Sequence, residues 1–180
     1  WYEYVYYDNE SEYQQDYICF SMQNLSAFTV SAELMPHMDA ATCVNESDIY
    51  FIDYDNGDLY RAQLNNQNRT ISEPEKIVND FAEGIVKSMA YNPIDNRVYF
   101  LDLIGDSIYL RAFSIETPEI IENFGTISKD IFIMAVNGEG YAYGIGYDEN
   151  LYRIFLENDP EAVLIGSTGL HHDYTHTTGS

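Results

Sequence analysis

Short apolar, aromatic-rich runs alternate with polar turns along most of the chain. Residues 49–64 show this most clearly, because the runs IYFID and LYRAQL flank the turn sequence Asp55-Asn56-Gly57-Asp58. Asn-Gly between alternating hydrophobic residues is a strong signal for a β-hairpin. No window carries the i, i+3, i+4, i+7 apolar stripe of an amphipathic helix. The pattern therefore predicts an all-β chain.

The hairpin belongs to a unit that recurs along the sequence. An Asn closes an apolar run at Asn45, Asn92 and Asn137, which are 47 and 45 positions apart. Each Asn is followed by a turn, an aromatic strand, a second turn, a third strand that contains Arg, and a fourth strand. The runs are DAATCV, IYFID, LYRAQL and EKIV in the first unit, VKSMAY, VYFLD, IYLRAF and EIIENF in the second, and IFIMAV, YAYGI, LYRIFL and EAVLIG in the third.

Units of this length with four antiparallel strands are typical of β-propeller blades. We therefore expect one β-propeller domain over residues 1–180, with about four four-stranded blades of roughly 45 residues each. The expected limits are a partial blade at 1–36 and full blades at 37–82, 83–128 and 129–167. In the partial blade, residues 4–8, 16–20 and 27–30 match the second, third and fourth strands of the unit. Residues 168–180 are either a strand that closes the ring or a disordered tail, and an arc of a larger propeller is the alternative to a closed ring.

Part of the repeat resembles a known class of propeller. Tyr50–Asp53 followed by Leu59–Arg61 resembles the YWTD-type repeat, and the second copy, Tyr99–Asp102, matches it nearly as well. The third copy departs from the motif at Gly144-Ile145, and no copy carries the Trp. The run MAYNPIDNRVYFLD is similar to the first-to-second strand junction of NHL-like extracytoplasmic propellers. The resemblance implies a propeller fold whose members mostly bind proteins or glycans or act as scaffolds, and a minority of which are hydrolases or lyases.

Charge excludes several classes of partner. The 180 residues include 30 acidic and 8 basic side chains, which gives a net charge of -22. Such a field repels nucleic acid and anionic lipid. No apolar run approaches the roughly 18 residues that a membrane-spanning helix needs, so we expect no membrane insertion. The 17 Tyr residues favour contact with a protein or a sugar.

These observations lead to a functional hypothesis. We expect a non-enzymatic extracytoplasmic propeller, extracellular or at the cell surface, that binds or scaffolds a protein or glycan partner. One alternative is a propeller-fold glycan hydrolase or lyase. Another is a surface-structure or adhesin subunit that self-associates through an open blade. No catalytic residues are predicted, because the sequence has no nucleophile elbow and no Gly-rich phosphate loop.

Five residues are the predicted ligand-binding set. Asp8, Asp53 and Asp102 end the aromatic strands of three units, and Tyr50 and Tyr99 lie in two of those strands. The alternative role for each Asp is to cap the turn that follows it.

The turn after residue 52 is a weak candidate for a metal site. Asp53, Asp55 and Asp58 could supply oxygen ligands to Ca²⁺, although the bidentate Glu of a calcium loop is missing. No other cofactor is expected.

The remaining candidates have mainly structural interpretations. Arg61, Arg111 and Arg153 recur in the third strands, and we expect them to link neighbouring strands or blades. The tail residues His171, His172 and His176 could bind a metal adventitiously. Cys19 and Cys43 either form a disulfide or remain buried thiols. The sequons at Asn24, Asn45 and Asn68 matter only in a eukaryotic secretory route.

Overall fold

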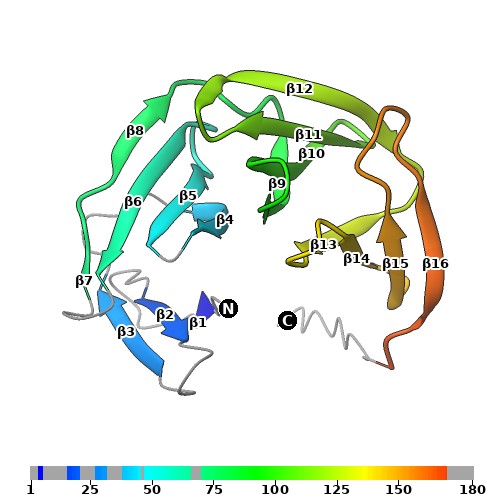
Figure 1. The fold of residues 1–180 in the computed structure, drawn as a ribbon, viewed down its shortest axis with the longest axis horizontal. Coiled ribbons are helices and arrows are strands. Elements are labelled where there is room, and N and C mark those ends of the chain that lie inside the picture. Colours follow the sequence, from blue (N-terminus) through cyan, green and yellow to red (C-terminus); the bar gives the residue numbers. More distant parts are fainter. Residues whose placement is uncertain are drawn as a thin grey trace, which may run out of the picture.

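The protein, seen here in a computed structural model, is a β-propeller-type arrangement of antiparallel sheets, and the structure describes residues 4–5, 16–20, 27–31, 38–45, 47–65 and 70–169. Four sheets follow one another around an arc in chain order (Figure 1). The first sheet contains β1 (Tyr4–Val5), β2 (Asp16–Phe20) and β3 (Ala27–Ser31). The second contains β4 (Met38–Val44), β5 (Asp48–Asp53), β6 (Leu59–Asn65), β7 (Thr70–Ile71) and β8 (Glu75–Val78).

The third and fourth sheets have four strands each. The third contains β9 (Ile85–Asn92), β10 (Arg97–Ile104), β11 (Ser107–Ser114) and β12 (Thr117–Ile127). The fourth contains β13 (Ile131–Val136), β14 (Ala142–Gly146), β15 (Asn150–Ile154) and β16 (Ala162–Ser167). Within the described residues, no helix has the length and hydrophobicity that a membrane span requires.

Each full sheet runs from an inner strand to an outer strand, and the inner strands β4, β9 and β13 are neighbours (Figure 1). Side-chain hydroxyls connect these inner strands. Thr42 Oγ1 of β4 accepts a hydrogen bond from the backbone N–H of Tyr91 in β9 at 3.2 Å. Ser88 Oγ of β9 accepts one from Met134 N of β13 at 3.0 Å and donates to the Met134 carbonyl at 3.3 Å. These three hydrogen bonds satisfy backbone groups of the inner strands.

The hydrophobic cores lie between consecutive sheets. Because side chains alternate along a strand, Tyr50 and Ile52 face the third sheet, whereas Ile49 and Phe51 face the other way. Between the second and third sheets, Phe81, Phe100 and Phe113 are at most 2% exposed. Their ring centroids are separated by 5.2 to 6.4 Å. A comparable cluster between the third and fourth sheets includes Leu110, Ile131 and Ile154.

The repeated Asn residues shape the turns that follow the inner strands. Asn137 Oδ1 accepts hydrogen bonds from the backbone N–H groups of Glu139 and Tyr141, at 3.0 and 2.9 Å. Asn92 Oδ1 accepts one from Ile94 N at 3.0 Å, and Asn45 adopts a left-handed backbone with φ of 59°. Asn tolerates both roles better than most residues, which explains why it recurs.

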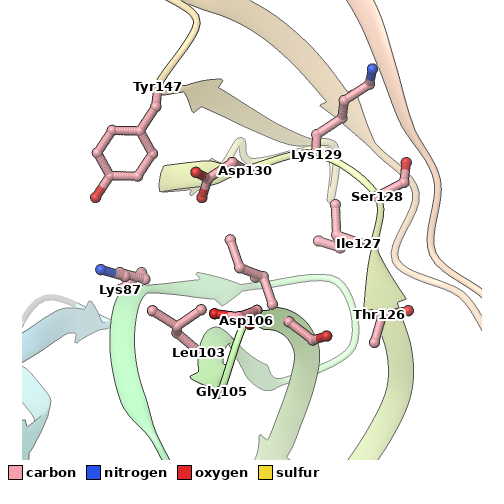
Figure 2. Close-up of a pocket in the computed structure, with 12 residues that line it drawn as sticks. Lys87, Leu103, Gly105, Asp106, Thr126, Ile127, Ser128, Lys129, Asp130 and Tyr147 are labelled. Atoms are coloured by element: carbon pink, nitrogen blue, oxygen red, sulfur yellow. The ribbon is translucent and has the colours of Figure 1, made fainter.

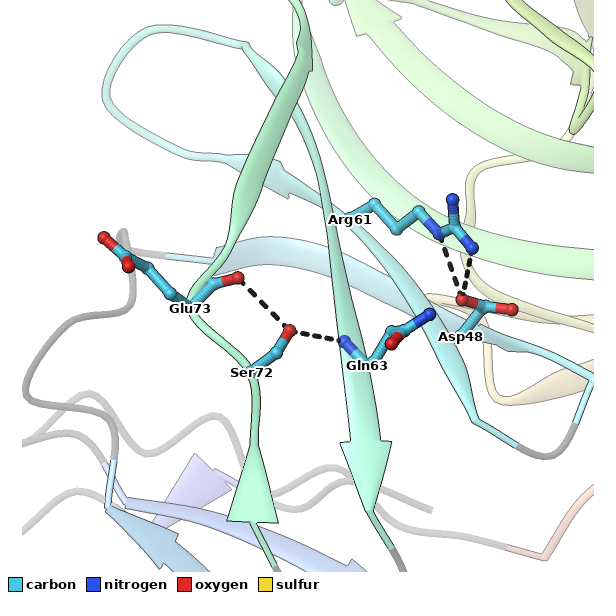
Figure 3. Close-up of polar contacts among 5 residues, drawn as sticks. All are labelled: Asp48, Arg61, Gln63, Ser72 and Glu73. Carbon is cyan, nitrogen blue, oxygen red and sulfur yellow. Dashed lines mark hydrogen bonds and ion pairs between the residues drawn. The ribbon is translucent and has the colours of Figure 1, made fainter.

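The all-β propeller fold predicted from the repeat is confirmed, with one addition. The second sheet has five strands, because β7 pairs with β6 before β8 does. Ser72 Oγ accepts a hydrogen bond from Gln63 N at 2.9 Å (Figure 3), and Ser72 N donates to the Gln63 carbonyl at 2.9 Å. Pro74 then interrupts the pairing, since it has no N–H. The predicted closing strand falls mostly in residues 170–180, outside the described residues, and the single-domain division and its blade limits stay predictions.

Candidate functional site

Two grooves open on the same rim of the arc, at equivalent places between consecutive sheets. Each is built from the turn between the second and third strands of one sheet and from the connection that leads into the next sheet. The larger groove, between the third and fourth sheets, has a volume of about 680 Å³. The smaller groove, between the second and third sheets, has a volume of about 330 Å³. The repeat itself therefore produces both grooves.

The larger rim groove combines an apolar floor with polar walls (Figure 2). Its lining comprises Lys87, Leu103, Gly105, Asp106, Ser107, Ile108, Thr126, Ile127, Ser128, Lys129, Asp130 and Tyr147. Figure 2 shows the Lys87 amino group and the Tyr147 hydroxyl on one side, with the Asp130 carboxylate turned into the groove and Lys129 extending away from it. Such a lining suits a polar, extended ligand that also carries apolar groups.

Tyr147 is held in place from two directions. Its backbone N–H donates to the Asp130 carbonyl at 3.0 Å, and its ring centroid lies 4.9 Å from that of Phe132. The side chain nevertheless remains 40% exposed. A positioned, partly exposed Tyr loses little conformational freedom on binding and is a favourable contact residue.

Lys87 is unusual among the basic residues of this acidic protein. Across residues 47–65 and 70–169, the cations with acidic partners are Arg61 with Asp48, Lys76 with Asp58, Arg97 with Glu122, and Arg111 with Glu83 and Asp102. Lys129 lies 5.9 Å from the ring centroid of Tyr152, and Arg153 packs on aromatic rings. Lys87 is half-buried in the groove and forms no ion pair with these described residues. Its ammonium is therefore available to a ligand.

The predicted metal ligands Asp53 and Asp58 are occupied by the protein's own donors. Asp53 Oδ1 accepts a hydrogen bond from Asp55 N at 3.2 Å, as a turn-capping Asp does. Asp58 is 4% exposed, and its Oδ1 accepts a hydrogen bond from Asp80 N at 2.8 Å while Lys76 contacts Oδ2. In the described part of the chain, no three His, Cys, Asp or Glu side chains form a group that could hold a metal ion. Binding of Ca²⁺ stays a prediction.

Asp58 anchors the β5–β6 turn to β8 and to the segment that follows it, and this makes stability depend on pH. Burial acts to raise its pKa, but the hydrogen bonds from Lys76 and Asp80 outweigh burial and lower the pKa below its usual value. A carboxylate with a lowered folded-state pKa stabilises the fold above its unfolded-state pKa, and the contribution is lost as pH falls through the folded-state pKa. We therefore expect Asp58→Asn to lower the free energy of unfolding at pH 7 and to matter progressively less below about pH 4. Urea unfolding of both proteins from pH 7 to pH 2.5 measures this, and a difference that grows on acidification would contradict it.

Asp102 has a different role from Asp53: Asp53 ends β5, whereas β10 continues past Asp102 to Ile104, so the prediction that Asp102 ends its strand is wrong. Asp102 is fully buried, and its Oδ2 lies 3.1 Å from Arg111 Nη1. Burial raises the pKa of Asp102, against the opposing effects of Arg111 and of the nearby backbone of Glu83 and Gly84. Arg111 also contacts Glu83 at 3.1 Å, in the connection between β8 and β9. The pair therefore fixes the connection that forms one wall of the smaller groove.

The structure describes four of the five predicted ligand-binding residues, and it does not bring these four together into one site. Tyr50 lies in the core between the second and third sheets, and Tyr99 lies in the core between the third and fourth. Tyr99 is 2% exposed; burial, and then its hydrogen bond to Asp95, raise its pKa to about 12. Both Tyr residues are buried because the recurring aromatic positions of the second strands are the positions that form the cores between sheets. Asp8 and the three tail His residues lie outside the described residues.

The three repeated Arg residues make three different sets of contacts. Arg61 pairs with Asp48 at 2.7 Å (Figure 3), and it lies opposite Tyr50 in the ladder. Arg111 lies opposite Phe100, and Tyr50 and Phe100 meet in one core from opposite sheets. Arg61 and Arg111 therefore point to opposite faces of their respective sheets. Arg153 lies opposite Tyr143, with its guanidinium carbon 4.1 Å from the ring centroid of Tyr141.

Sequence reasoning missed the residues that define the larger rim groove. Lys87 and Lys129 come just before or at the start of inner strands, where a basic residue in a strongly acidic chain is an available signal. Tyr147 follows a strand that ends in Gly146 instead of Asp. A local sequence pattern does not show that these positions, which belong to two different sheets, lie in one groove.

Comparisons with known proteins support the fold alone. No protein-family model matches the sequence, and no curated protein matches it. A structural genomics protein of unknown function from Bacteroides thetaiotaomicron VPI-5482 superposes with a TM-score of 0.54 and 14% identity, over 82% of this chain and 38% of that one. A functionally unknown protein from Desulfotomaculum acetoxidans DSM 771 superposes with a TM-score of 0.52 and 14% identity, over 87% of this chain and 47% of that one.

A third similar structure is YCF48 bound to D1 peptide, with a TM-score of 0.47, 11% identity, and 83% and 47% coverage. This chain spans less than half the length of each of these three solved proteins.

Proposed function

We propose that this protein is a non-enzymatic binding or scaffold propeller, working outside the cytoplasm, that receives a protein or glycan partner in the larger rim groove. The observation that carries the proposal is the lining of that groove: a positioned Tyr147, a Lys87 ammonium without an acidic partner among the described residues, and wall hydroxyls over an apolar floor. Hydrogen-bonding groups over an apolar surface provide both orientation and binding energy.

The partner's chemistry is constrained by the charges of the groove. The residues that line this groove include two basic ones, Lys87 and Lys129, and two acidic ones, Asp106 and Asp130, within a protein of net charge -22. By contrast, the smaller groove is lined by Asp53 and Asp55 and has no basic residue. A ligand with an anionic or strongly polar group is therefore repelled less at the larger groove than elsewhere on the rim.

Binding is tested with a displayed peptide library and a glycan array, each probed with the purified chain. Lys87→Ala and Tyr147→Ala are each expected to weaken a captured ligand about tenfold or more, because central contact residues are worth about 1–2 kcal/mol or more. Tyr54→Ala, an exposed Tyr at the smaller groove, is the matched control and should leave the affinity unchanged. Equal affinity in the wild type and both groove variants would place the ligand elsewhere.

A glycan hydrolase or lyase is the second candidate, and one observation favours it. Asp106 and Asp130 line the same groove from different elements, the β10–β11 turn and the β12–β13 connection. Two carboxylates across a groove are the usual machinery of glycoside hydrolysis. Turnover of a polysaccharide that Asp130→Asn abolishes, while binding persists, would replace the binding proposal with this one.

A further inference from the structure

The outward face of the fourth sheet, on the side away from the third sheet, is apolar and aromatic. Alternation along β13 to β16 places Ile133, Tyr143, Ile145, Arg153 and Val163 on this face, with Phe155 beside them; we call these six residues the terminal face. Ile133 and Val163 are both 41% exposed and Phe155 is 38% exposed. None of the six belongs to a hydrophobic core formed by the described residues.

The corresponding face of each preceding full sheet is covered. Tyr50 and Ile52 of the second sheet pack against Val98, Phe100 and Phe113 of the third. Tyr99 and Leu101 of the third sheet pack in the same way against Ile131, Met134 and Ala142 of the fourth. In both cases the covering sheet is the next one in the chain, as the order around the arc in Figure 1 shows. The two covered faces therefore show that a sheet with aliphatic and aromatic side chains fits against such a face.

Arg153 gives the terminal face a cationic centre. Its guanidinium carbon lies 4.1, 5.5 and 5.5 Å from the ring centroids of Tyr141, Tyr143 and Phe155. Its Nε is buried and makes no hydrogen bond to the described residues. Two copies of this chain meeting face to face would bring two such guanidinium groups together, in addition to the repulsion between two chains of net charge -22. Self-pairing is therefore disfavoured.

We propose that a further four-stranded antiparallel sheet of the same polypeptide, encoded beyond codon 180, covers the terminal face. Its inner side carries alternating aliphatic and aromatic residues, as β9–β12 does toward β4–β8. This chain covers only 38% and 47% of the lengths of the two solved structures with TM-scores of 0.54 and 0.52, which is consistent with additional sheets. The proposal concerns assembly of the propeller and does not depend on what occupies the rim groove.

The test reads the gene past codon 180 and then compares the 180-residue chain with the extended protein by hydroxyl-radical footprinting. We expect the reading frame to continue into another unit of about 45 codons with an Asn-closed apolar run. In the extended protein, oxidation of Phe155 should fall about tenfold, and so should oxidation of Tyr141, whose ring packs against Arg153 at the edge of the terminal face. Tyr54, which is exposed at the rim, is the internal control and should be oxidised equally in both proteins.

Three results would overturn the proposal. The first is a reading frame that stops without another unit. The second is an extended protein in which Tyr141 and Phe155 remain as reactive as before while Tyr54 is unchanged. The third is a dimer of the 180-residue chain, found by sedimentation and dissociated by Arg153→Glu, which would assign the terminal face to a second copy.

Discussion

Replacing Phe100 with alanine is expected to lower the free energy of unfolding by about 3–5 kcal/mol, the usual cost of removing a fully buried aromatic ring. Phe100 is completely buried, and its ring packs against Phe81 and Phe113 between two sheets. The expected loss has two parts: the favourable free energy of burying the ring, and the cost of the cavity that remains because the two packed sheets cannot close it. Urea unfolding followed by circular dichroism measures the change.

The matched control for Phe100→Ala is Ile120→Ala on the outer strand β12. Ile120 is 58% exposed, so its truncation should change stability by less than about 0.5 kcal/mol. A loss below about 1 kcal/mol for Phe100→Ala would contradict packing of the second sheet against the third.

The second large effect concerns the buried ion pair of Asp102 and Arg111. Asp102→Ala leaves the Arg111 guanidinium, 6% exposed, with only the exposed Glu83 as an acidic partner among the described residues. Removing one member of a buried pair typically costs about 3–5 kcal/mol. The double variant Asp102→Leu/Arg111→Met should recover most of that loss, because it removes both charges and keeps the volume. Urea denaturation of the single and double variants measures both changes.

The control for this pair is Arg97 with Glu122, whose side chains are 32% and 44% exposed. Glu122→Ala should cost at most about 1 kcal/mol, since solvent screens an exposed pair. If Asp102→Ala proved as mild as Glu122→Ala, the Asp102 carboxylate would not be a buried anchor of the β8–β9 connection.

Much of the fold could be predicted from the sequence, because the repeat gives the order in which apolar strands and polar turns alternate along the chain. Residues 16–20 were expected to be a strand and are β2, and EKIV is β8. The third strands show where the prediction was too coarse. Arg61 directly follows Tyr60, whereas Leu110 separates Arg111 from Tyr109, and a displacement of one residue turns a side chain to the other face of the sheet. The sequence contains this difference, and treating the Arg residues as equivalent overlooks it.

The candidate site could be predicted far less well. Asp53, Asp102, Tyr50 and Tyr99 stood out because they recur, and they recur because they build turns and cores. The larger rim groove depends on Lys87, which does not recur, and on Tyr147, which lies 60 positions further along the chain. Their proximity follows from the packing of the third sheet against the fourth, which a pattern within one unit does not specify.

The contact between Ser88 and Met134 tests the central claim most directly, because it joins two inner strands 46 residues apart immediately beside the larger rim groove. In the folded protein, nuclear Overhauser spectra should show a cross-peak between the β-protons of Ser88 and the amide proton of Met134, together with the β9–β10 ladder peaks. Presence of the ladder peaks with no Ser88–Met134 peak would show that the sheets form without packing around a common axis, and would contradict both the propeller arrangement and the groove built on it.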